Sequence, residues 1–234
     1  MEIREYIEAS YSKQVNFFEE SEAFQCLVSG DADKAFYDNF IGNICQTHLK
    51  SPQILAFLYS AAPPTVAPHI MHNMLEELGL DEEGISHPSL LYKLADSARF
   101  TEEMMQQLEN GFQEELKELM SEPFLFGTLK EFGLSVLLEV TCFEWMLSRL
   151  SSRIGKALEQ YHHLSAASLE WFYHHSEVDI RHAEEGLDSV VNYIEYYGFD
   201  QENLSAIIDI TFRENIFIKR YFGEFALVME TQMI

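Results

Sequence analysis

Three side chains in the segment FYHHSEVDIRH (residues 172–182) have the types and spacing of metal ligands. His175, Asp179 and His182 are separated by four and then three positions, so in a helix they share one face over two turns. Two imidazoles and one carboxylate that converge in this way suit divalent iron, manganese or zinc. His174 is rotated about 100° from them and is expected to pack or to contact a ligand from behind. An exposed acidic helix can carry this spacing by chance, so the trio needs partners elsewhere in the chain.

Further carboxylates and one histidine occur where such partners are needed. Glu139 and Glu144 interrupt the apolar run VLLEVTCFEWML, where a carboxylate is costly unless it is paired or bound to a metal. Glu76 or Glu77 could act together with His87, across a segment interrupted by glycines. Carboxylates and histidines from several helices are the ligands of di-iron sites in helical bundles.

Three segments, NMLEELGLDEEGISH, FEWMLSRL and HHSEVDIRHAEE, together resemble the haem-oxygenase-like di-iron oxidases. In that family a glutamate is followed by a histidine seven to ten residues later. A second glutamate comes from a central helix, and H-x3-D-x2-H follows roughly thirty residues further on. Here Glu77 and His87 are ten positions apart, and Glu144 and His175 are thirty-one. The resemblance covers about residues 20–190, and its last motif is the specific part.

The resemblance implies a fold, a cofactor and a set of ligands. The fold is an all-α, seven-helix haem-oxygenase-like bundle. The cofactor is a pair of iron ions that uses O2 as co-substrate and draws electrons from an external reductant. Carried over position by position, the metal ligands are Glu77, His87, Glu144, His175, Asp179 and His182. Glu76 is then expected to be a surface acid, and Glu139 a hydrogen-bonded core acid.

The resemblance also suggests the substrate. The family's reactions include N-oxygenation and oxidative fragmentation of amino acids, nitrile formation from a tryptophan-type amino acid, and decarboxylation of medium-chain fatty acids. Each substrate carries a carboxylate, for which Arg149 and Arg181 are the candidate partners. Aromatic residues are frequent in the ligand-bearing segments, which favours an aromatic amino acid. The most specific hypothesis is the formation of a nitrile from a tryptophan-type amino acid, either plain or halogenated, in natural-product biosynthesis. The alternative is a medium-chain fatty-acid decarboxylase or an amino-acid N-oxygenase.

One branch of the family, the para-aminobenzoate synthases, uses a Tyr and a Lys of the protein itself. By offset, those positions hold Phe24 and Ile154 in this chain. We therefore expect repeated turnover of an added substrate, without consumption of the protein's own side chains.

Other classes of protein stay open. A ferritin-like di-iron protein needs two E-x-x-H pairs, and Glu159 with His162 is one such pair. A thiaminase-like hydrolase would use Cys142 near Glu144, but it leaves the H-x3-D-x2-H motif unexplained. A haem-binding oxygenase needs an early axial histidine, and the first histidine here is His48. A helical interaction module without catalysis would be separated from all of these by a metal assay.

The elements that must position these residues are helices. Apolar residues recur at intervals of three and four almost throughout, and no segment alternates convincingly as a strand. Long helices are expected over residues 127–160, 165–198 and 201–230. Asp31 is the N-cap candidate of an early helix and Asp200 that of the last one.

Composition narrows the class of protein further. The chain has 234 residues, of which 47% are hydrophobic, and a single domain over residues 1–234 is expected. The formal net charge of −24 argues against nucleic acid and anionic membranes as partners. Three cysteines without a CxxC pair disfavour a disulfide framework and fit a reducing cytoplasm. We expect a cytoplasmic enzyme with a small-molecule substrate, and a homodimer stays open.

Overall fold

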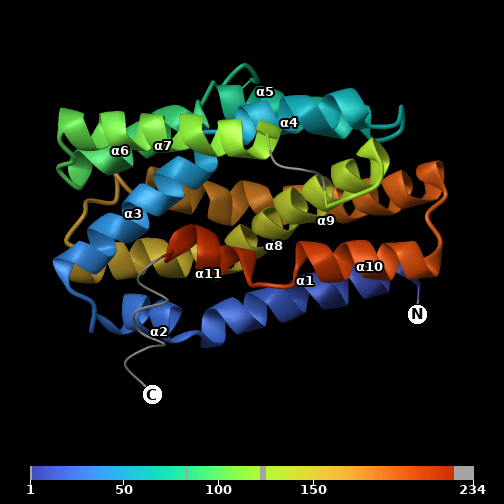
Figure 1. The fold of residues 1–234 in the computed structure, drawn as a ribbon. Helices are drawn as coiled ribbons and strands as arrows, with labels where there is room; N and C mark the ends of the chain where they lie inside the picture. The colour runs from blue at the N-terminus through green and yellow to red at the C-terminus, as the bar shows by residue number, and fades with distance from the viewer. Residues whose placement is uncertain (1, 83, 122–124, 224–234) are drawn as a thin grey trace.

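The computed structural model describes residues 2–82, 84–121 and 125–223, which form helices and no strand (Figure 1). The helices are α1 (Ile3–Glu20), α2 (Glu22–Ser29), α3 (Lys34–His48), α4 (Ser51–Ala61), α5 (Ala67–Leu78), α6 (His87–Ser97), α7 (Glu102–Ser121), α8 (Leu129–Tyr161), α9 (Glu170–Tyr197), α10 (Gln201–Thr211) and α11 (Ile216–Tyr221). The predicted all-α fold is confirmed. The described residues form more helices than the seven expected, because short connections divide several of the expected segments.

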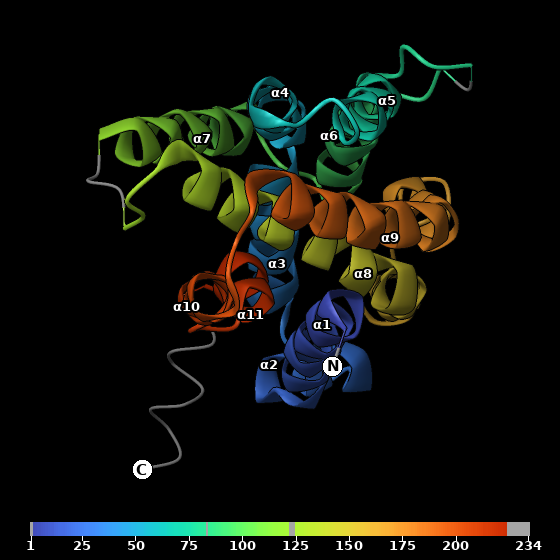
Figure 2. The same ribbon diagram turned by 90° about the vertical axis from the view of Figure 1, so that its right-hand side faces the viewer.

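Helices α8 and α9 occupy the middle of the molecule (Figures 1 and 2). Helices α4 to α7 cover them on one side, while α1, α2, α10 and α11 cover them on the other. Helix α3 runs diagonally between the two outer layers and packs against α6, α7 and α11. The two central helices therefore present side chains to both layers.

The close pairing of α8 and α9 depends on a glycine. A Cβ on Gly186 of α9 would lie 2.8 Å from Cγ2 of Thr141 on α8. Thr141 is fixed in place, because its hydroxyl donates to the carbonyl of Leu137 at 2.8 Å and is hydrogen-bonded to the Tyr11 hydroxyl. Glu144 lies one turn further along α8, so this contact also sets the distance between Glu144 and α9.

Two sequence-based expectations about helix ends are corrected. Asp33, not Asp31, caps α3, and its carboxylate accepts from the backbone N–H of Phe36 at 2.8 Å. The expected last helix begins as predicted after its Asp200 cap but ends at Thr211. A new helix, α11, then begins at Ile216 and is capped by the side chain of Asn215. Residues 224–230 of the expected helix lie outside the described residues.

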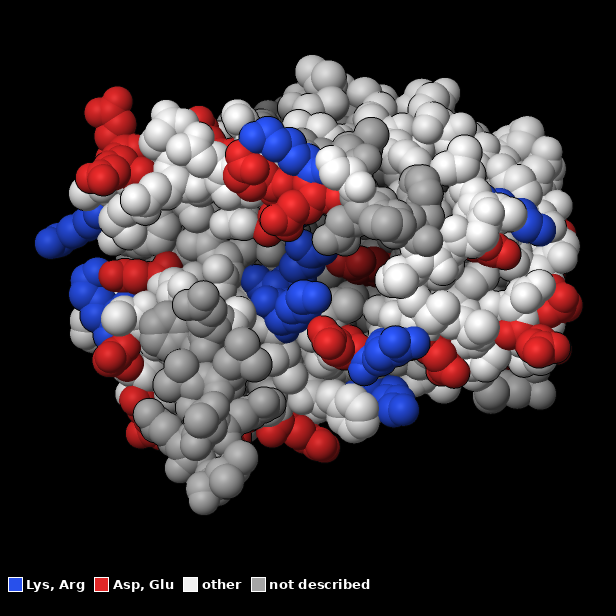
Figure 3. Space-filling model, viewed as in Figure 1, with Lys and Arg blue, Asp and Glu red and all other residues white. Residues whose placement is uncertain are grey.

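Charges of both signs are mixed on the surface. On the face seen in Figure 3, basic side chains occur in small groups beside acidic ones, and they form no continuous patch among the described residues. Within the same residues, no helix combines the length and the apolar character that crossing a membrane requires.

Candidate metal centre

The six predicted ligands come from four helices. Glu77 lies in the last turn of α5, His87 is the first residue of α6, and Glu144 lies in the middle of α8. His175, Asp179 and His182 follow one another along the buried face of α9. All except the partly buried Glu77 are less than 10% exposed. The structure thus places the predicted residues in the interior. Among the described residues, three potential ligand atoms converge only at Glu77, His87 and His175, while Glu144, Asp179 and His182 interact electrostatically beside them.

A tight turn brings the first two ligands together. Gly79 ends α5 in the left-handed conformation, with φ of 66°. A Cβ at this position would lie 2.6 Å from the backbone nitrogen of Ser86, so the returning chain passes directly against the glycine. As a result, His87 at the start of α6 faces Glu77 at the end of α5, with 3.1 Å between Nδ1 and Oε1.

The first trio consists of Glu77, His87 and His175. One potential ligand atom from each lies within 4.8 Å of the other two. The Nδ1 atom of His175 donates to the carbonyl of Trp171 at 2.7 Å, which leaves Nε2 free to bind a metal. Burial lowers the pKa of His175 well below its usual value, so the ring is held in the neutral form that metals require.

His87 behaves differently because it has an acidic neighbour. Burial opposes its protonation, but the hydrogen bond and the charge of Glu77 outweigh burial and raise the pKa of His87. Its ring lies 4.6 Å from that of His175, between centroids. One carboxylate and two imidazoles in contact form a donor set suited to divalent iron.

The second trio consists of Glu144, Asp179 and His182. Burial raises the pKa of Glu144 to about 8, although the nearby charge of His182 opposes this rise. Burial likewise raises the pKa of Asp179 to about 6. One oxygen of Asp179 lies 3.2 Å from Nδ1 of His182, while Oδ2 is buried without a hydrogen-bond partner among the described residues.

These observations test whether iron fits the site. A buried carboxylate oxygen without a partner is costly, and two further carboxylates, Glu77 and Glu144, act on Asp179 and on each other electrostatically. A divalent cation would offset this concentration of negative charge and would use the unpartnered oxygen as a ligand. The converging donors of Glu77, His87 and His175 therefore fit one divalent ion, and Glu144, Asp179 and His182 are of the types that could bind a second.

Two residues beside the ligands were missed or misassigned by the sequence analysis. Glu76, expected to be a surface acid, is only 13% exposed and accepts from Nε2 of His182 at 2.7 Å. It also pairs with Arg181. Asn73, one turn earlier on α5, donates its amide to Oε1 of Glu144. These two contacts depend on how the end of α5 packs against α8 and α9, and the sequence pattern does not predict this packing.

The structure also separates the two acids of α8. Glu139 is about one-third exposed, and its Oε1 lies 3.5 Å from Nη2 of Arg220, on another side of the helix from the two trios. It is thus an ion-paired acid rather than the expected hydrogen-bonded core acid. Glu144 is the α8 acid that faces α9, where it interacts electrostatically with His182 and Asp179.

The two arginines proposed for the substrate do not line either recess described below. Arg149 lies with its guanidinium 3.5 Å above the ring of Trp145 and donates to the Trp145 carbonyl. Arg181 is held by Glu76, with Glu185 at 4.0 Å. The structure thus gives Arg149 no place at the site and makes Arg181 the partner of an acid beside it.

The residues of the rival classes are engaged elsewhere. Glu159 accepts from Tyr173, while His162 lies 3.2 Å from Asp38, so this E-x-x-H pair does not converge on a metal. Cys142 is completely buried, and burial raises the pKa of its thiol well above the usual value, which disfavours a nucleophilic role. His48 bonds the Tyr221 hydroxyl through Nε2 at 2.6 Å.

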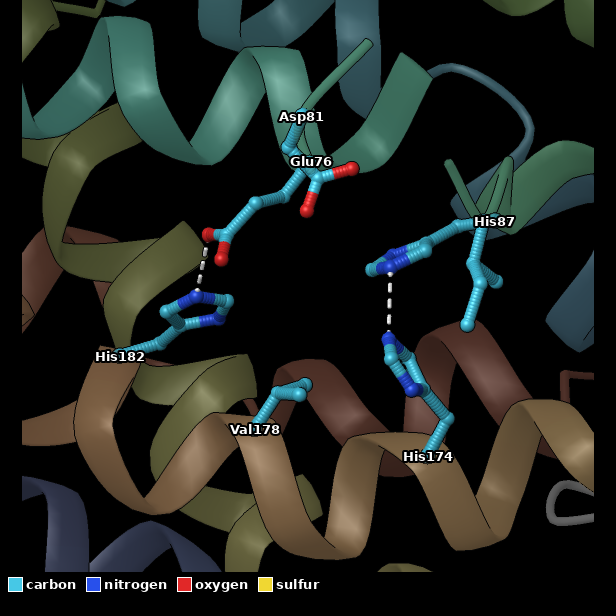
Figure 4. Close-up of a pocket in the computed structure, with 7 residues that line it drawn as sticks. Glu76, Asp81, His87, His174, Val178 and His182 are labelled. Atoms are coloured by element: carbon cyan, nitrogen blue, oxygen red, sulfur yellow. Dashed lines mark hydrogen bonds and ion pairs between the residues drawn. The ribbon is translucent and has the colours of Figure 1, made fainter. Parts of the chain in front are cut away.

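Two recesses lead to the trios, and their linings differ. The donor recess, between α5, α6 and α9, is lined by Glu76, Asp81, His87, His174 and His182, with Val178 and Ile85 beside them. Figure 4 shows the Glu76–His182 pair on one side of it and the His87–His174 pair on the other.

The aliphatic recess lies between α4, α5, α8 and α9. Its apolar wall consists of Leu55, Leu58, Ile70, Leu137 and Val140. Glu144 and His182 also line it, so this recess touches the second trio. Its polar lining also includes His69, Asn73, Thr141, Glu185 and Ser189, while no Phe, Tyr, Trp, Lys or Arg contributes to it among the described residues.

Comparisons with known proteins agree with this picture. The sequence matches, over residues 38–204, a family described as iron-containing redox enzymes, and the matched segment contains all six predicted ligands. A solved structure from Shewanella denitrificans, a domain of unknown function with a haem oxygenase-like fold, aligns with a TM-score of 0.55 and 14% sequence identity. The alignment covers 100% of this chain and 95% of that one. No curated protein matches the chain.

Proposed function

Because the chain belongs to the family of iron-containing redox enzymes and has a haem-oxygenase-like all-α fold, we propose that it is a non-haem di-iron oxidoreductase that oxidises a small organic molecule with O2. The observation that carries this proposal is the converging trio Glu77, His87 and His175. Beside it lies Asp179, whose buried Oδ2 has no hydrogen-bond partner among the described residues. Glu77, His87 and His175 would hold one iron. Glu144, Asp179 and His182 would hold the other.

Bound iron would supply the O2 and electron-transfer chemistry that no side chain provides, with electrons from an external reductant. The chain's own residues prepare the site for this. The Trp171 carbonyl fixes the tautomer of His175, and Asn73 holds one oxygen of Glu144. Both contacts orient ligands before metal arrives. The surrounding apolar side chains exclude water, which strengthens every electrostatic interaction inside.

The aliphatic recess is the place where a substrate would meet the second trio. Its leucine, isoleucine and valine wall favours an aliphatic chain over an aromatic ring. Two of the aromatic residues that suggested an aromatic substrate are engaged elsewhere, whereas Trp171 lies beside His175. Phe143 packs against Phe217 and Tyr221, and Trp145 lies beneath Arg149.

This lining bears on the choice between substrates. The formation of a nitrile from a tryptophan-type amino acid remains a prediction of the resemblance. The aliphatic wall favours the second candidate, oxidative decarboxylation of a medium-chain fatty acid. Since no Lys or Arg among the described residues lines the recess, the metal ions themselves would be the cations nearest to a substrate carboxylate.

Metal analysis after anaerobic loading with Fe(II) tests the proposal. About two irons per chain are expected, and His175→Ala should lose the ion of the first trio. A wild-type stoichiometry near zero, with the helical circular dichroism spectrum intact, would refute the di-iron assignment. O2 consumption by the loaded protein, measured with amino acids, tryptophans and fatty acids in turn, then separates the substrate classes.

A further inference from the structure

We propose that the donor recess is the port through which divalent metal ions enter the site, with Asp81, Glu76 and His174 as transient ligands on the way. The inference rests on the proposed function, because it assumes that the two trios bind metal. It assigns a role to three side chains that the ligand set does not use.

The lining of the donor recess connects the surface to both trios. His87 belongs to the first trio and His182 to the second, and both line this recess. Glu76 contacts His182 at 2.7 Å, and His174 contacts His87 at 3.1 Å between the two Nε2 atoms. Each inner histidine thus has a further potential donor directly beside it, so an ion could pass from one donor to the next.

Asp81 is the outermost of these donors. It is partly exposed, and it follows α5 in the turn after Gly79. In Figure 4 it lies beside Glu76 at the edge of the recess. Its Oδ1 accepts from the backbone N–H of Gly84 at 3.1 Å, which fixes the carboxylate at this edge.

The contrast with the second opening favours this division of roles. The aliphatic recess has five apolar side chains beside its polar ones, and this apolar wall offers a hydrated dication no replacement for its water ligands. In the donor recess, five of the seven lining residues are carboxylates or imidazoles. Arg181, which would repel a cation, is paired with Glu76 and does not line the recess.

The test compares rates of metal uptake by two matched variants. Asp81→Asn keeps an oxygen that can accept from Gly84 but removes the charge. Glu82→Gln removes one charge from the neighbouring exposed residue, which does not line the recess. Metal-free protein is mixed with Co(II) in a stopped-flow instrument. Uptake is followed by cobalt absorbance and by quenching of Trp171, whose ring lies 4.2 Å from that of His175.

We expect Asp81→Asn to slow uptake at least about tenfold, within the range by which local charge changes association rates, while Glu82→Gln changes it less than about twofold. The final amount of cobalt bound should equal that of the wild type in both variants. Equal rates of cobalt uptake in the two variants would refute the proposed entry route. A lower final stoichiometry in Asp81→Asn would also overturn it, because Asp81 would then be a resident ligand.

A second pair strengthens the comparison. Asp81→Lys places a cation at the edge of the recess and should slow uptake further, while Glu82→Lys makes the same charge reversal outside it and should have a much smaller effect. Failure of the proposed function has a different signature. In that case the wild type itself would bind no cobalt, whatever the variants do.

Discussion

Replacing Gly186 by alanine tests the closest contact between α8 and α9. The new Cβ would lie 2.8 Å from Cγ2 and 3.0 Å from Cβ of Thr141, and 3.3 Å from Oε2 of Glu144. Carbon atoms pack best at about 3.5–4.0 Å, so several tenths of an ångström must be found by moving the helices apart. Thr141 cannot rotate away without losing its hydrogen bonds to Leu137 and Tyr11.

The expected magnitude follows from two opposing terms. Overpacking of this kind costs about 1–3 kcal/mol, while alanine in place of glycine stabilises a helix by about 1 kcal/mol. The net destabilisation by Gly186→Ala is therefore about 1 kcal/mol. Gly42→Ala in α3 is the matched control, since the nearest atoms to its Cβ, from Leu108 and Phe100, are 3.7 Å away. That variant should gain roughly 0.5–1 kcal/mol.

Thermal unfolding of the metal-free variants measures the difference. A gap near 2 kcal/mol corresponds to about 4–8 °C in Tm for a chain of this size, with Gly42→Ala above the wild type and Gly186→Ala below it. Because the new methyl group also presses on Glu144, Gly186→Ala should weaken binding of the second iron more than the first. If both variants melt together above the wild type, the inferred close contact is wrong.

Four further outcomes are expected. Glu144→Ala should reduce iron stoichiometry by about one ion per chain, whereas Glu139→Ala should leave it unchanged; loss of iron only in the Glu139 variant would reverse the assignment. Burial raises the pKa of Glu144 to about 8 from 4.5. Between these two pH values the folded metal-free chain keeps the Glu144 proton, whereas the unfolded chain loses it, so the stability of the fold falls as pH rises. Glu144→Gln cannot ionise, and its advantage over the wild type in urea unfolding should grow by roughly 2–3 kcal/mol between pH 5.5 and 7.5; a constant difference would contradict the buried carboxylate. Leu58→Phe, which fills the aliphatic recess, should weaken stimulation of O2 uptake by the substrate without changing iron content, and an unchanged response would place the substrate elsewhere. Turnover should exceed one product per chain without mass loss from the protein, because buried Phe24 and Ile154 stand where the self-consuming branch has Tyr and Lys; a single equivalent of product would refute this.

Helical periodicity explains why the shared face of most candidate ligands could be predicted. His175, Asp179 and His182 share a face in any regular helix, whatever surrounds it. Glu144 and Glu139 differ by five positions, or about 140° of rotation, so only one of them can face α9. The family spacing selected the same acid that the structure places beside His182 and Asp179.

Tertiary packing decided what the sequence pattern missed. Glu76 and Glu77 are neighbours about 100° apart, and both reach α9 because the end of α5 crosses it. No local pattern reports this crossing. The break before α11 also interrupts a continuous apolar periodicity, because the Asn215 side chain accepts from the backbone N–H of Ile218, the third residue of α11. Asp31 and Asp33 were equally good caps by type, and Asp31 instead accepts from the Ser29 hydroxyl.

Both ring nitrogens of His182 are engaged before any metal arrives, one by Asp179 and the other by Glu76. In the first trio, His87 is engaged in the same way by Glu77 and His174. An ion at either trio must therefore separate donors that already contact one another. The metal-free chain would be closed at this site, so loading with metal would depend on how often these side chains part.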